Sequence, residues 1–386
     1  MSAAAPRIAM VAGETSGDLL AGLLLDGMQA LWPQLQAHGI GGAQMQARGF
    51  DAWWPSDTLA VHGYSLELVR RLSEIVGIRK QLRRRLLADK PDVFIGVDAP
   101  DFNLGLETDL RAAGTKTVHF VCPSIWAWRA ERIDRIRRAA DHVLCIFPFE
   151  PELLERHGIA ATYVGHPLAD VIPLVPDRAA ARRQLGLSPD GQVLAILPGS
   201  RRAEVEYISE GFFKAAALVR QALPAIELIV PAVPALYERI AAQAQASGLG
   251  NAIKVVSGQS HAVLAACDVT LIASGTATLE AALFKRPMVI GYRMHPVSWQ
   301  LMRRKQLQPW VGLPNILCQD FVVPELIQGA ATPQALAAAV LQWLDAQYSD
   351  PGRIAALQAR FTALHHSLLR NTPQLAANAI RQILAA

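Results

Sequence analysis

The strongest constraint on the fold is a strand, turn, helix and strand pattern in residues 267–292, CDVTLIASGTATLEAALFKRPMVIGY. The apolar, β-branched residues 269–273 predict a buried strand, and the small residues SGTA interrupt it before a helical pattern. Pro287 ends that helix, and residues 288–292 predict the next strand. A strand that returns through a helix is typical of a βαβ unit, so the stretch predicts a parallel α/β sheet.

The turn at residues 274–277 has the requirements of a phosphate site, because a helix N-terminus offers unpaired backbone N–H groups and a positive dipole end. Glu280 follows four residues after Thr276, the best N-cap candidate, and is therefore off the spacing of a capping box. A carboxylate there can accept both hydroxyls of a nucleotide ribose. The alternative is an ordinary connection with a Ser or Thr cap. The substrate-binding candidates in this stretch are Ser274, Gly275, Thr276, Ala277 and Glu280.

The same alternation runs along the whole chain in two series. Strands are predicted at 7–12, 92–97, 117–121 and 142–146 in the first series, and at 193–197, 227–230, 253–256, 269–273 and 288–292 in the second. The proline-rich stretch 167–176 predicts the linker, while 39–42 and 53–55 are interpreted as loops around a short element. We therefore expect domains at 1–170 and 171–345, followed by helices at 346–386 that pack back toward the first domain; 386 residues suffice for two large cores.

Composition excludes several classes of protein. The four cysteines are far apart and include no C-x-x-C pair, which fits a reducing cytosol without a zinc site or disulfide framework. No apolar run approaches the roughly 20 residues needed to span a bilayer. The N-terminus lacks the pattern of a signal peptide. We expect a globular protein that is neither secreted nor membrane-spanning.

Two further strand ends carry candidate site residues. Asp98 follows the strand at 92–97, at the edge where parallel α/β sheets bind ligands, and Asp101 or Asn103 can cap the next helix in its place. Residues 13–18, GETSGD, form a glycine-bearing turn that lacks the three-glycine spacing of an NAD site.

In the second series, Gly199 permits close backbone approach, Ser200 can cap the helix predicted near 204–223, and Arg201 can hold a phosphate with two hydrogen bonds. Together with residues 274–277, this turn predicts a pyrophosphate between two helix N-termini.

Residues 64–85 form a basic and apolar segment, with seven Lys or Arg residues against two Glu, a surplus of five positive charges. It contains more aliphatic residues than one buried helical stripe requires. A basic, apolar helix pair can lie on an anionic membrane surface, and the alternative is a packed helix with a solvated basic face. Nucleic-acid binding is disfavoured because aliphatic rather than aromatic residues interleave the charges and no recognition motif accompanies them.

The ordered motifs of the chain resemble one family, the lipid-A-disaccharide synthases. They are GETSGD (13–18), GVDAPDFN (96–103), PSIWAWR (123–129), PFE (148–150), GHP (165–167), LPGSR (197–201), ASGTATLE (273–280), GYRM (291–294) and LPN (313–315). Each motif is weak alone, and the ordered set is specific. Cys122 replaces an expected serine, and residues 297–312 diverge.

The resemblance implies a B-type glycosyltransferase, with two Rossmann-like domains facing a cleft and C-terminal helices crossing back to the first domain. It implies transfer of glucosamine from UDP-2,3-diacylglucosamine to 2,3-diacylglucosamine 1-phosphate, with inversion to a β-1,6 link. Because both substrates are acylated, it also favours a cytoplasmic enzyme held at the inner membrane by residues 64–85. No cofactor is expected, and a homodimer is left open.

Roles for single residues follow from the resemblance and from residue chemistry together. Asp98 is the predicted base, with Glu14 and Asp18 as reserve candidates. No Asp-x-Asp pair of the kind that carries a divalent ion is present, so we expect no metal. The remaining predicted substrate-binding residues are Ser16, Gly17, Gly199, Ser200, Arg201 and Asn315. Arg129, Arg132 and the cluster at 303–305 are alternatives for the acceptor phosphate.

Two other functions fit the same sequence. One is a UDP-sugar epimerase or hydrolase of the same architecture, which would share the nucleotide site. The other is a non-catalytic protein that binds a sugar nucleotide or a lipid. Formation of a disaccharide, or turnover of the UDP-sugar, distinguishes the synthase from both.

Overall fold

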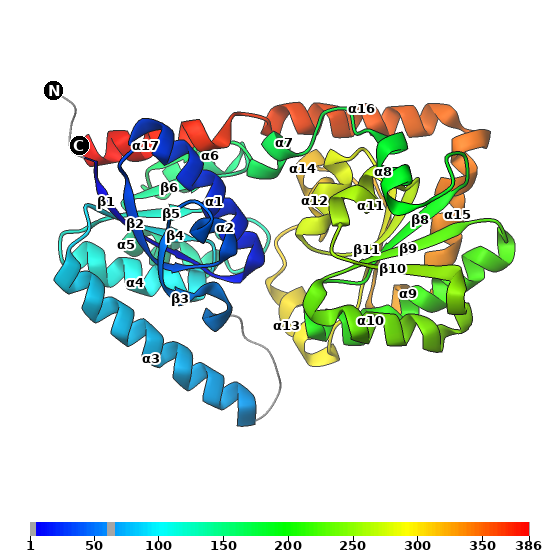
Figure 1. Cartoon of the computed structure of the whole chain (residues 1–386), viewed down its shortest axis with the longest axis horizontal. Coiled ribbons are helices and arrows are strands. Elements are labelled where there is room, and N and C mark those ends of the chain that lie inside the picture. The colour runs from blue at the N-terminus through cyan, green and yellow to red at the C-terminus, as the bar shows by residue number, and fades with distance from the viewer. Residues whose placement is uncertain (1–4, 60–65, 386) are drawn as a thin grey trace. The chain divides into compact units, whose positions relative to one another are not determined.

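The computed structural model describes residues 5–59 and 66–385, and its contacts divide the chain into two units, Met1–Asp170 with Ser367–Ala386 and Val171–His366 (Figure 1). The predicted linker at 167–176 is not all loop, since Pro167–Val171 forms the short helix α7. The predicted third part, 346–386, is divided between the two units.

The described part of the first unit contains a seven-stranded parallel sheet in the order β3-β2-β1-β4-β5-β6-β7. Its strands are β1 Arg7–Ala12, β2 Gln36–Gly41, β3 Asp51–Pro55, β4 Val93–Val97, β5 Lys116–Phe120, β6 His142–Cys145 and β7 Ala161–Tyr163. Its helices are α1 Glu14–Leu31, α2 Ala43–Gln46, α3 Leu66–Asp89, α4 Pro100–Ala112, α5 Ile133–Ala139, α6 Glu150–Glu155, α7 and α17 Thr372–Ala385. The strand order reverses between β1 and β4, which is the switch point where doubly wound sheets bind ligands.

The second unit repeats this topology with a six-stranded parallel sheet in the order β10-β9-β8-β11-β12-β13 among the described residues. Its strands are β8 Val193–Leu197, β9 Glu227–Ala232, β10 Ile253–Ser257, β11 Val269–Ala273, β12 Met288–Tyr292 and β13 Glu325–Ile327. Its helices are α8 Arg178–Leu185, α9 Arg202–Ala222, α10 Tyr237–Ala244, α11 Ser260–Ala266, α12 Thr276–Leu283, α13 Pro296–Lys305, α14 Leu313–Cys318, α15 Pro333–Ser349 and α16 Pro351–Leu368, the last of which ends in the first unit. The switch point lies between β8 and β11, and the prediction of two Rossmann-like domains is confirmed.

The interpretation of residues 39–42 and 53–55 as loops is wrong, because they end β2 and β3. The glycines of β2 hide the strand pattern from sequence analysis, because glycine is typical of loops. Gly39 has φ +138°, and a Cβ there would lie 2.1 Å from the carbonyl oxygen of Met10 in β1. The glycine lets β2 approach β1, although glycine is depleted in strands generally.

The predicted basic helix pair is one continuous helix, α3, and residues 64 and 65 lie outside the described part of the chain. Its Leu82 and Leu86 are fully buried, whereas Val76, Lys80 and Arg84 are exposed. Within the described residues, no helix combines the length and apolar character needed to cross a membrane. The C-terminal helix α17 packs against α1 in the first unit (Figure 1).

Candidate functional site

Most of the predicted site residues lie in or after the turns at the switch points of the two sheets, and Asn315 lies on α14. In the first unit, β1 leads into Gly13 and β4 leads into Asp98, and a Cβ on Gly13 would lie 3.4 Å from Cβ of Ala99. In the second unit, β8 leads into Gly199 and β11 leads into Ser274. These pairs of strands are direct neighbours, so each unit brings together the two turns that the sequence singles out.

Asp98 and Ala99 form an unusual turn between β4 and α4. Both are left-handed, with φ +51° and +43°, a conformation that non-glycine residues adopt at a cost and that often marks functional sites. The N–H of Asp98 donates to the carbonyl of Phe120, and the buried amide of Asn103 donates to the carbonyl of Asp98 at 2.8 Å. Asn103 therefore holds the backbone of the predicted base.

The expected cap on α4 is wrong. The N-cap is Ala99, with no side-chain hydrogen bond, and neither Asp101 nor Asn103 takes that position. Asp101 instead lies in the first turn of α4 and pairs with arginines.

The predicted turn at residues 13–18 is shorter than expected, because α1 begins at Glu14. Ser16 is exposed in the first helical turn, Gly17 is buried, and the side chain of Glu14 lies outside the described part of the chain. Asp18 is 4% exposed, and its carboxylate accepts N–H groups of Gly42 at 2.7 Å and Gln44 at 2.8 Å. These contacts anchor the end of β2, and a role for Asp18 in catalysis stays a prediction.

The turn after β8 has the expected backbone but a different cap. Gly199 has φ +120°, and the N-cap of α9 is Arg201 rather than Ser200. The carboxylate of Glu204 accepts N–H groups of Ser200 at 3.1 Å and Arg201 at 3.3 Å. The amides assigned to a pyrophosphate are thus directed at a negative group, which is the chemistry that the prediction requires.

The turn after β11 is capped by Gly275, so the prediction of Thr276 as the N-cap is wrong. Ser274 donates its hydroxyl to the carbonyl of Val311 at 3.1 Å. Glu280, whose side chain is 18% exposed, lies 3.2 Å from Nε2 of His261 on α11. The carboxylate predicted to bind ribose is therefore partly exposed and has a histidine beside it, which is not among the predicted site residues.

Asn315 is fully buried, and its contacts are structural. Its amide donates to the carbonyl of Val323 at 2.9 Å and to Glu325 at 2.8 Å, and its oxygen accepts the N–H of Val323 at 3.0 Å. Glu325 also accepts N–H groups of Val311 and Gly312, and burial raises the pKa of its carboxyl group. The sequence does not predict a role for Glu325, because β13, on which it lies, is too short to show a strand pattern. Asn315 and Glu325 together hold the loop around Val311, whose carbonyl accepts the hydrogen bond of Ser274.

Three other motifs, at 123–129, 148–150 and 165–167, meet in the first unit around Glu150. Its fully buried carboxyl group accepts N–H groups of Ile146 at 3.2 Å, Phe147 at 3.0 Å and the Trp126 indole at 2.9 Å, while burial raises its pKa to about 8. His166 lies beside Phe147, and burial lowers its pKa to about 3. These residues pack against the loop 123–129, which follows β5.

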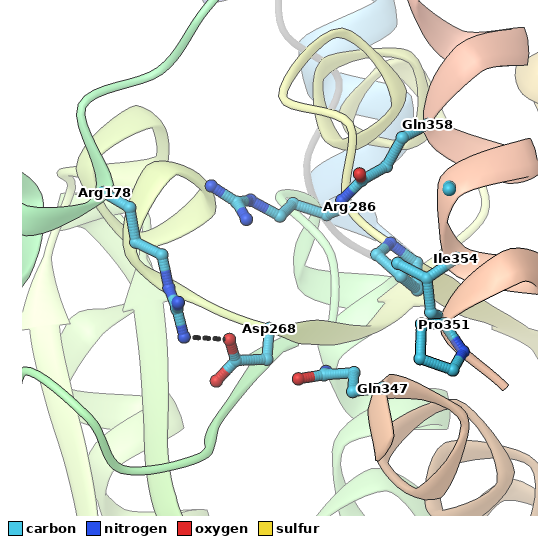
Figure 2. Close-up of a pocket in the computed structure, with 9 residues that line it drawn as sticks. Arg178, Asp268, Arg286, Gln347, Pro351, Ile354 and Gln358 are labelled. Carbon is cyan, nitrogen blue, oxygen red and sulfur yellow. Dashed lines mark hydrogen bonds and ion pairs between the residues drawn. The ribbon is translucent and has the colours of Figure 1, made fainter. Parts of the chain in front are cut away.

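A cavity of about 260 Å³ lies in the second unit at the opposite edge of the sheet, where β11 begins (Figure 2). Arg178, Asp268, Arg286 and residues of α15 and α16 line it. Arg178 pairs with Asp268, and Arg286 donates to the carbonyls of Leu264 and Ala265. Because it lies at the amino ends of the strands, this cavity is separate from the switch-point site.

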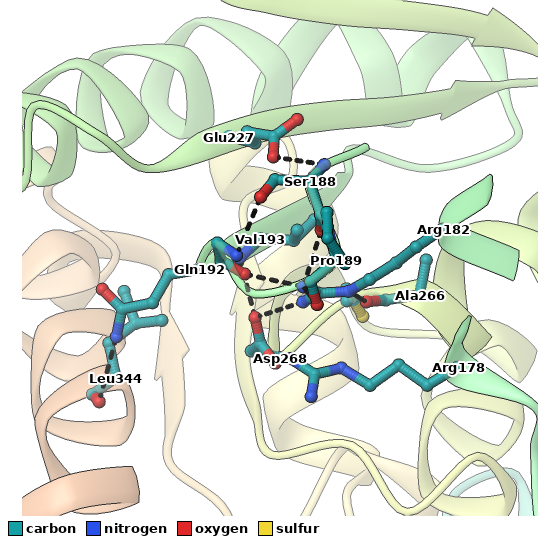
Figure 3. Close-up of polar contacts among 12 residues, drawn as sticks. Arg178, Arg182, Ser188, Pro189, Gln192, Val193, Glu227, Ala266, Asp268 and Leu344 are labelled. Carbon is teal, nitrogen blue, oxygen red and sulfur yellow. Dashed lines mark hydrogen bonds and ion pairs between the residues drawn. The ribbon is translucent and has the colours of Figure 1, made fainter. Parts of the chain in front are cut away.

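Arg182, a buried residue of α8, is an anchor of the second unit (Figure 3). Its side chain is 2% exposed and donates to Asp268 at 2.8 Å and to the carbonyls of Ala266, Ser188, Pro189 and Gly191. These contacts tie α8 to the start of β11.

Residues 8–380 match the family model described as "Lipid-A-disaccharide synthetase". The chain belongs to the lipid-A-disaccharide synthase family. Similar proteins named lipid-A-disaccharide synthase come from Verminephrobacter eiseniae, 71% identical over 98% of this chain and 97% of that protein, and from Albidiferax ferrireducens, 69% identical with the same coverage.

Solved structures share the fold at low identity. A UDP-GlcNAc 2-epimerase from Neisseria meningitidis, bound to UDP-GlcNAc, has a TM-score of 0.64 at 11% identity and covers 98% of this chain and 99% of its own. MurG from Acinetobacter baumannii has a TM-score of 0.56 at 14% identity, covering 98% and 100%. At 11% and 14% identity these structures show the fold alone, so the family match separates the two predicted activities.

Proposed function

We propose that this protein is a lipid-A-disaccharide synthase. It transfers 2,3-diacylglucosamine from UDP-2,3-diacylglucosamine to 2,3-diacylglucosamine 1-phosphate, and releases UDP. The observation that carries the proposal is the family match over residues 8–380, which spans both switch points. The epimerase or hydrolase alternative is not favoured, because it is supported by fold similarity alone.

Asp98 is the proposed base. The carboxylate takes the proton of the acceptor 6-hydroxyl while that oxygen bonds to C1 of the donor, and the bond between C1 and the UDP oxygen breaks from the opposite face. Its left-handed backbone, held through Asn103, supports a fixed direction for the carboxylate. A base that receives the proton in the transition state contributes about 10²–10⁴-fold in rate.

The second unit is proposed to bind UDP. The N–H groups of Ser200 and Arg201, together with the turn 274–277, receive the diphosphate, and Glu280 receives the ribose. The diphosphate takes the place of the Glu204 carboxylate on these amides. Because amides and Arg201 stabilise the departing charge, no divalent ion is required.

The test is a product assay with purified donor and acceptor, run with and without excess EDTA. We expect disaccharide and UDP in equal amounts, unchanged by EDTA, and a fall in kcat of about 10²–10⁴-fold for Asp98→Asn. Asp26→Asn is the control, since Asp26 is an exposed residue of α1 that pairs with Arg48. Nearly full turnover by a folded Asp98→Asn enzyme contradicts the base assignment, and loss of activity in EDTA contradicts the metal-free mechanism.

The exposed side of α3 is proposed to contact the anionic inner-membrane surface. Val76, Lys80 and Arg84 recur every four residues and are all exposed, so they share one face. Two other arginines of α3 contact residues of the first unit. Arg83 Nε lies 2.7 Å from Oδ2 of Asp109, and the guanidinium carbon of Arg85 lies 3.5 Å from the ring centre of Trp53. A face with two cations and an aliphatic residue favours anionic lipid.

Sedimentation with vesicles that contain phosphatidylglycerol tests this contact. Lys80→Glu with Arg84→Glu should abolish co-sedimentation and leave the folded state intact. Arg183→Glu with Lys214→Glu makes the same charge change on exposed residues of the second unit and should have little effect. If the α3 double variant co-sediments with vesicles as fully as the control variant does, α3 is an ordinary solvated helix.

A further inference from the structure

Three arginines of the first unit converge on one carboxylate beside the predicted base. Arg132 Nη2 lies 2.6 Å from both oxygens of Asp101, Arg129 Nη1 lies 3.4 Å from Oδ2, and Arg135 Nη1 lies 3.7 Å from Oδ1. Asp101 stands three residues after Asp98, in the first turn of α4. The arginines follow β5, whose neighbour in the sheet is β4.

The Asp101 carboxylate alone does not satisfy all the N–H donors of these three arginines. Charge-assisted N–H···O bonds are about 2.7–2.9 Å long, so the contacts of Arg129 and Arg135 are too long to be strong ones. Each guanidinium carries five N–H donors. Residues 129–138 contain five arginines against Glu131 and Asp134, and with Asp101 included two positive charges remain in surplus.

The cluster is also held in place and open to a ligand. Arg129 is left-handed, with φ +57°, and its guanidinium lies 4.2 Å from the ring centre of Trp128. Arg132 is 9% exposed, which fixes its direction, whereas the side chain of Asp101 is 68% exposed. The stacking on Trp128 and the left-handed backbone restrict the side chain of Arg129. It therefore loses less conformational entropy on binding a ligand than a free surface arginine does.

We propose that Arg129, Arg132 and Arg135 bind the phosphate monoester of the acceptor, and that Asp101 occupies their donors when no acceptor is bound. This inference rests on the proposed function. If Asp98 receives the proton of the 6-hydroxyl, the phosphate on C1 lies across the same pyranose ring. The adjacent ends of β4 and β5 place a base and a cationic cluster side by side, as that substrate requires.

A phosphate monoester suits this site better than the Asp101 carboxylate alone. It carries up to two negative charges and three terminal oxygens, which can accept from three guanidinium groups in different directions. The surplus of two positive charges is neutralised by such a dianion.

The test pairs two variants with two acceptors. The variants are Arg129→Gln and Arg135→Gln, both at partly exposed side chains so that folding is kept. The acceptors are 2,3-diacylglucosamine 1-phosphate and the same sugar without its phosphate. With the phosphorylated acceptor, we expect each variant to raise the acceptor KM about tenfold, the loss of one charge-assisted hydrogen bond, with kcat and the donor KM unchanged.

With the dephosphorylated acceptor, wild type and variants should have equal kcat/KM, because the group that the arginines bind is gone. The matched control is Arg137→Gln, on the same helix as Arg135. Arg137 pairs with Asp134, and the variant should behave as wild type with both acceptors. Equal losses on the two acceptors, or no loss on either, overturn the phosphate site. Wild type that forms no disaccharide from either acceptor instead overturns the proposed function, so the two failures are distinguishable.

Discussion

Replacing Gly199 by alanine tests whether the turn after β8 is the UDP site. Gly199 has φ +120°, which an alanine adopts only with strain. A Cβ there would lie 2.7 Å from both Cβ and Oε2 of Glu204. Alanine therefore meets the side chain whose carboxylate holds the N–H groups of Ser200 and Arg201.

The magnitude follows from these two conflicts. Backbone strain at such a position costs about 1–3 kcal/mol. Overpacking costs about 1–3 kcal/mol more, although Glu204 can relieve part of it by moving. We expect a free energy of unfolding lower by about 2–4 kcal/mol, which corresponds to a fall in Tm of roughly 4–16 °C for a unit of this size.

The relaxed loop should also lose UDP affinity. If the amides of Ser200 and Arg201 both turn away from the diphosphate, two hydrogen bonds to a charged group are lost, each about 1.5–3 kcal/mol. The Kd for UDP should then rise at least about 100-fold, and about tenfold if one bond survives. Calorimetric titration with UDP, well below the Tm of the variant, measures this change.

Gly211→Ala is the matched control, because Gly211 lies inside α9 and a Cβ there meets nothing within 4 Å. It should raise stability by about 0.5–1 kcal/mol and leave UDP binding unchanged. A folded Gly199→Ala protein that binds UDP as wild type does would refute the diphosphate assignment. Unchanged stability would refute the steric reasoning.

Two further predictions concern buried charges. Asp268→Asn should lower the free energy of unfolding by about 3–5 kcal/mol, because Arg182 loses its buried ionic partner. Thermal unfolding measures this loss, with Arg183→Ala, at an exposed position of α8, as the control. A difference between the two variants of less than about 1 kcal/mol would contradict the prediction. Burial raises the pKa of Glu150 to about 8. The folded state therefore binds a proton more tightly than the unfolded state, and stability from this group should be present below about pH 4.5 and decline as pH rises toward 8. Glu150→Gln should flatten that part of the pH profile of Tm, and an unchanged slope would assign it to other groups.

The sequence predicts the buried strands of both units well, because β1, β4, β8 and β11 are continuous apolar runs that end in turn residues. It fails at β2 and at the edge strand β3, whose residues mix glycine, polar groups and tryptophan. Their position depends on pairing with strands far along the chain, which local patterning does not encode.

The sequence also identifies the turns at the switch points, since motif position along an α/β chain predicts where strand ends meet. It assigns caps poorly. Gly275, Arg201 and Ala99 cap the three site helices without a side-chain hydrogen bond from a Ser, Thr or Asp at that position. At α9 the carboxylate of Glu204 accepts the N–H groups of Ser200 and Arg201 instead. Cap propensities concern the residue at the N-cap itself, so they do not predict such an arrangement.

The two switch points share a topology but differ in chemistry, and the difference lies in the first residues after each strand. After β8, Pro198 and Gly199 lead directly to helical amides, and the nearest negative group is a side chain that an anionic ligand can replace. After β4, Asp98 itself is the strand-end residue, and its backbone is fixed by Asn103 beneath it. The Asp98 carboxylate can accept a proton, whereas the amides after β8 attract phosphate and cannot accept one. These two turns support the proposal that the base lies in the first unit and that the leaving group is bound by the second.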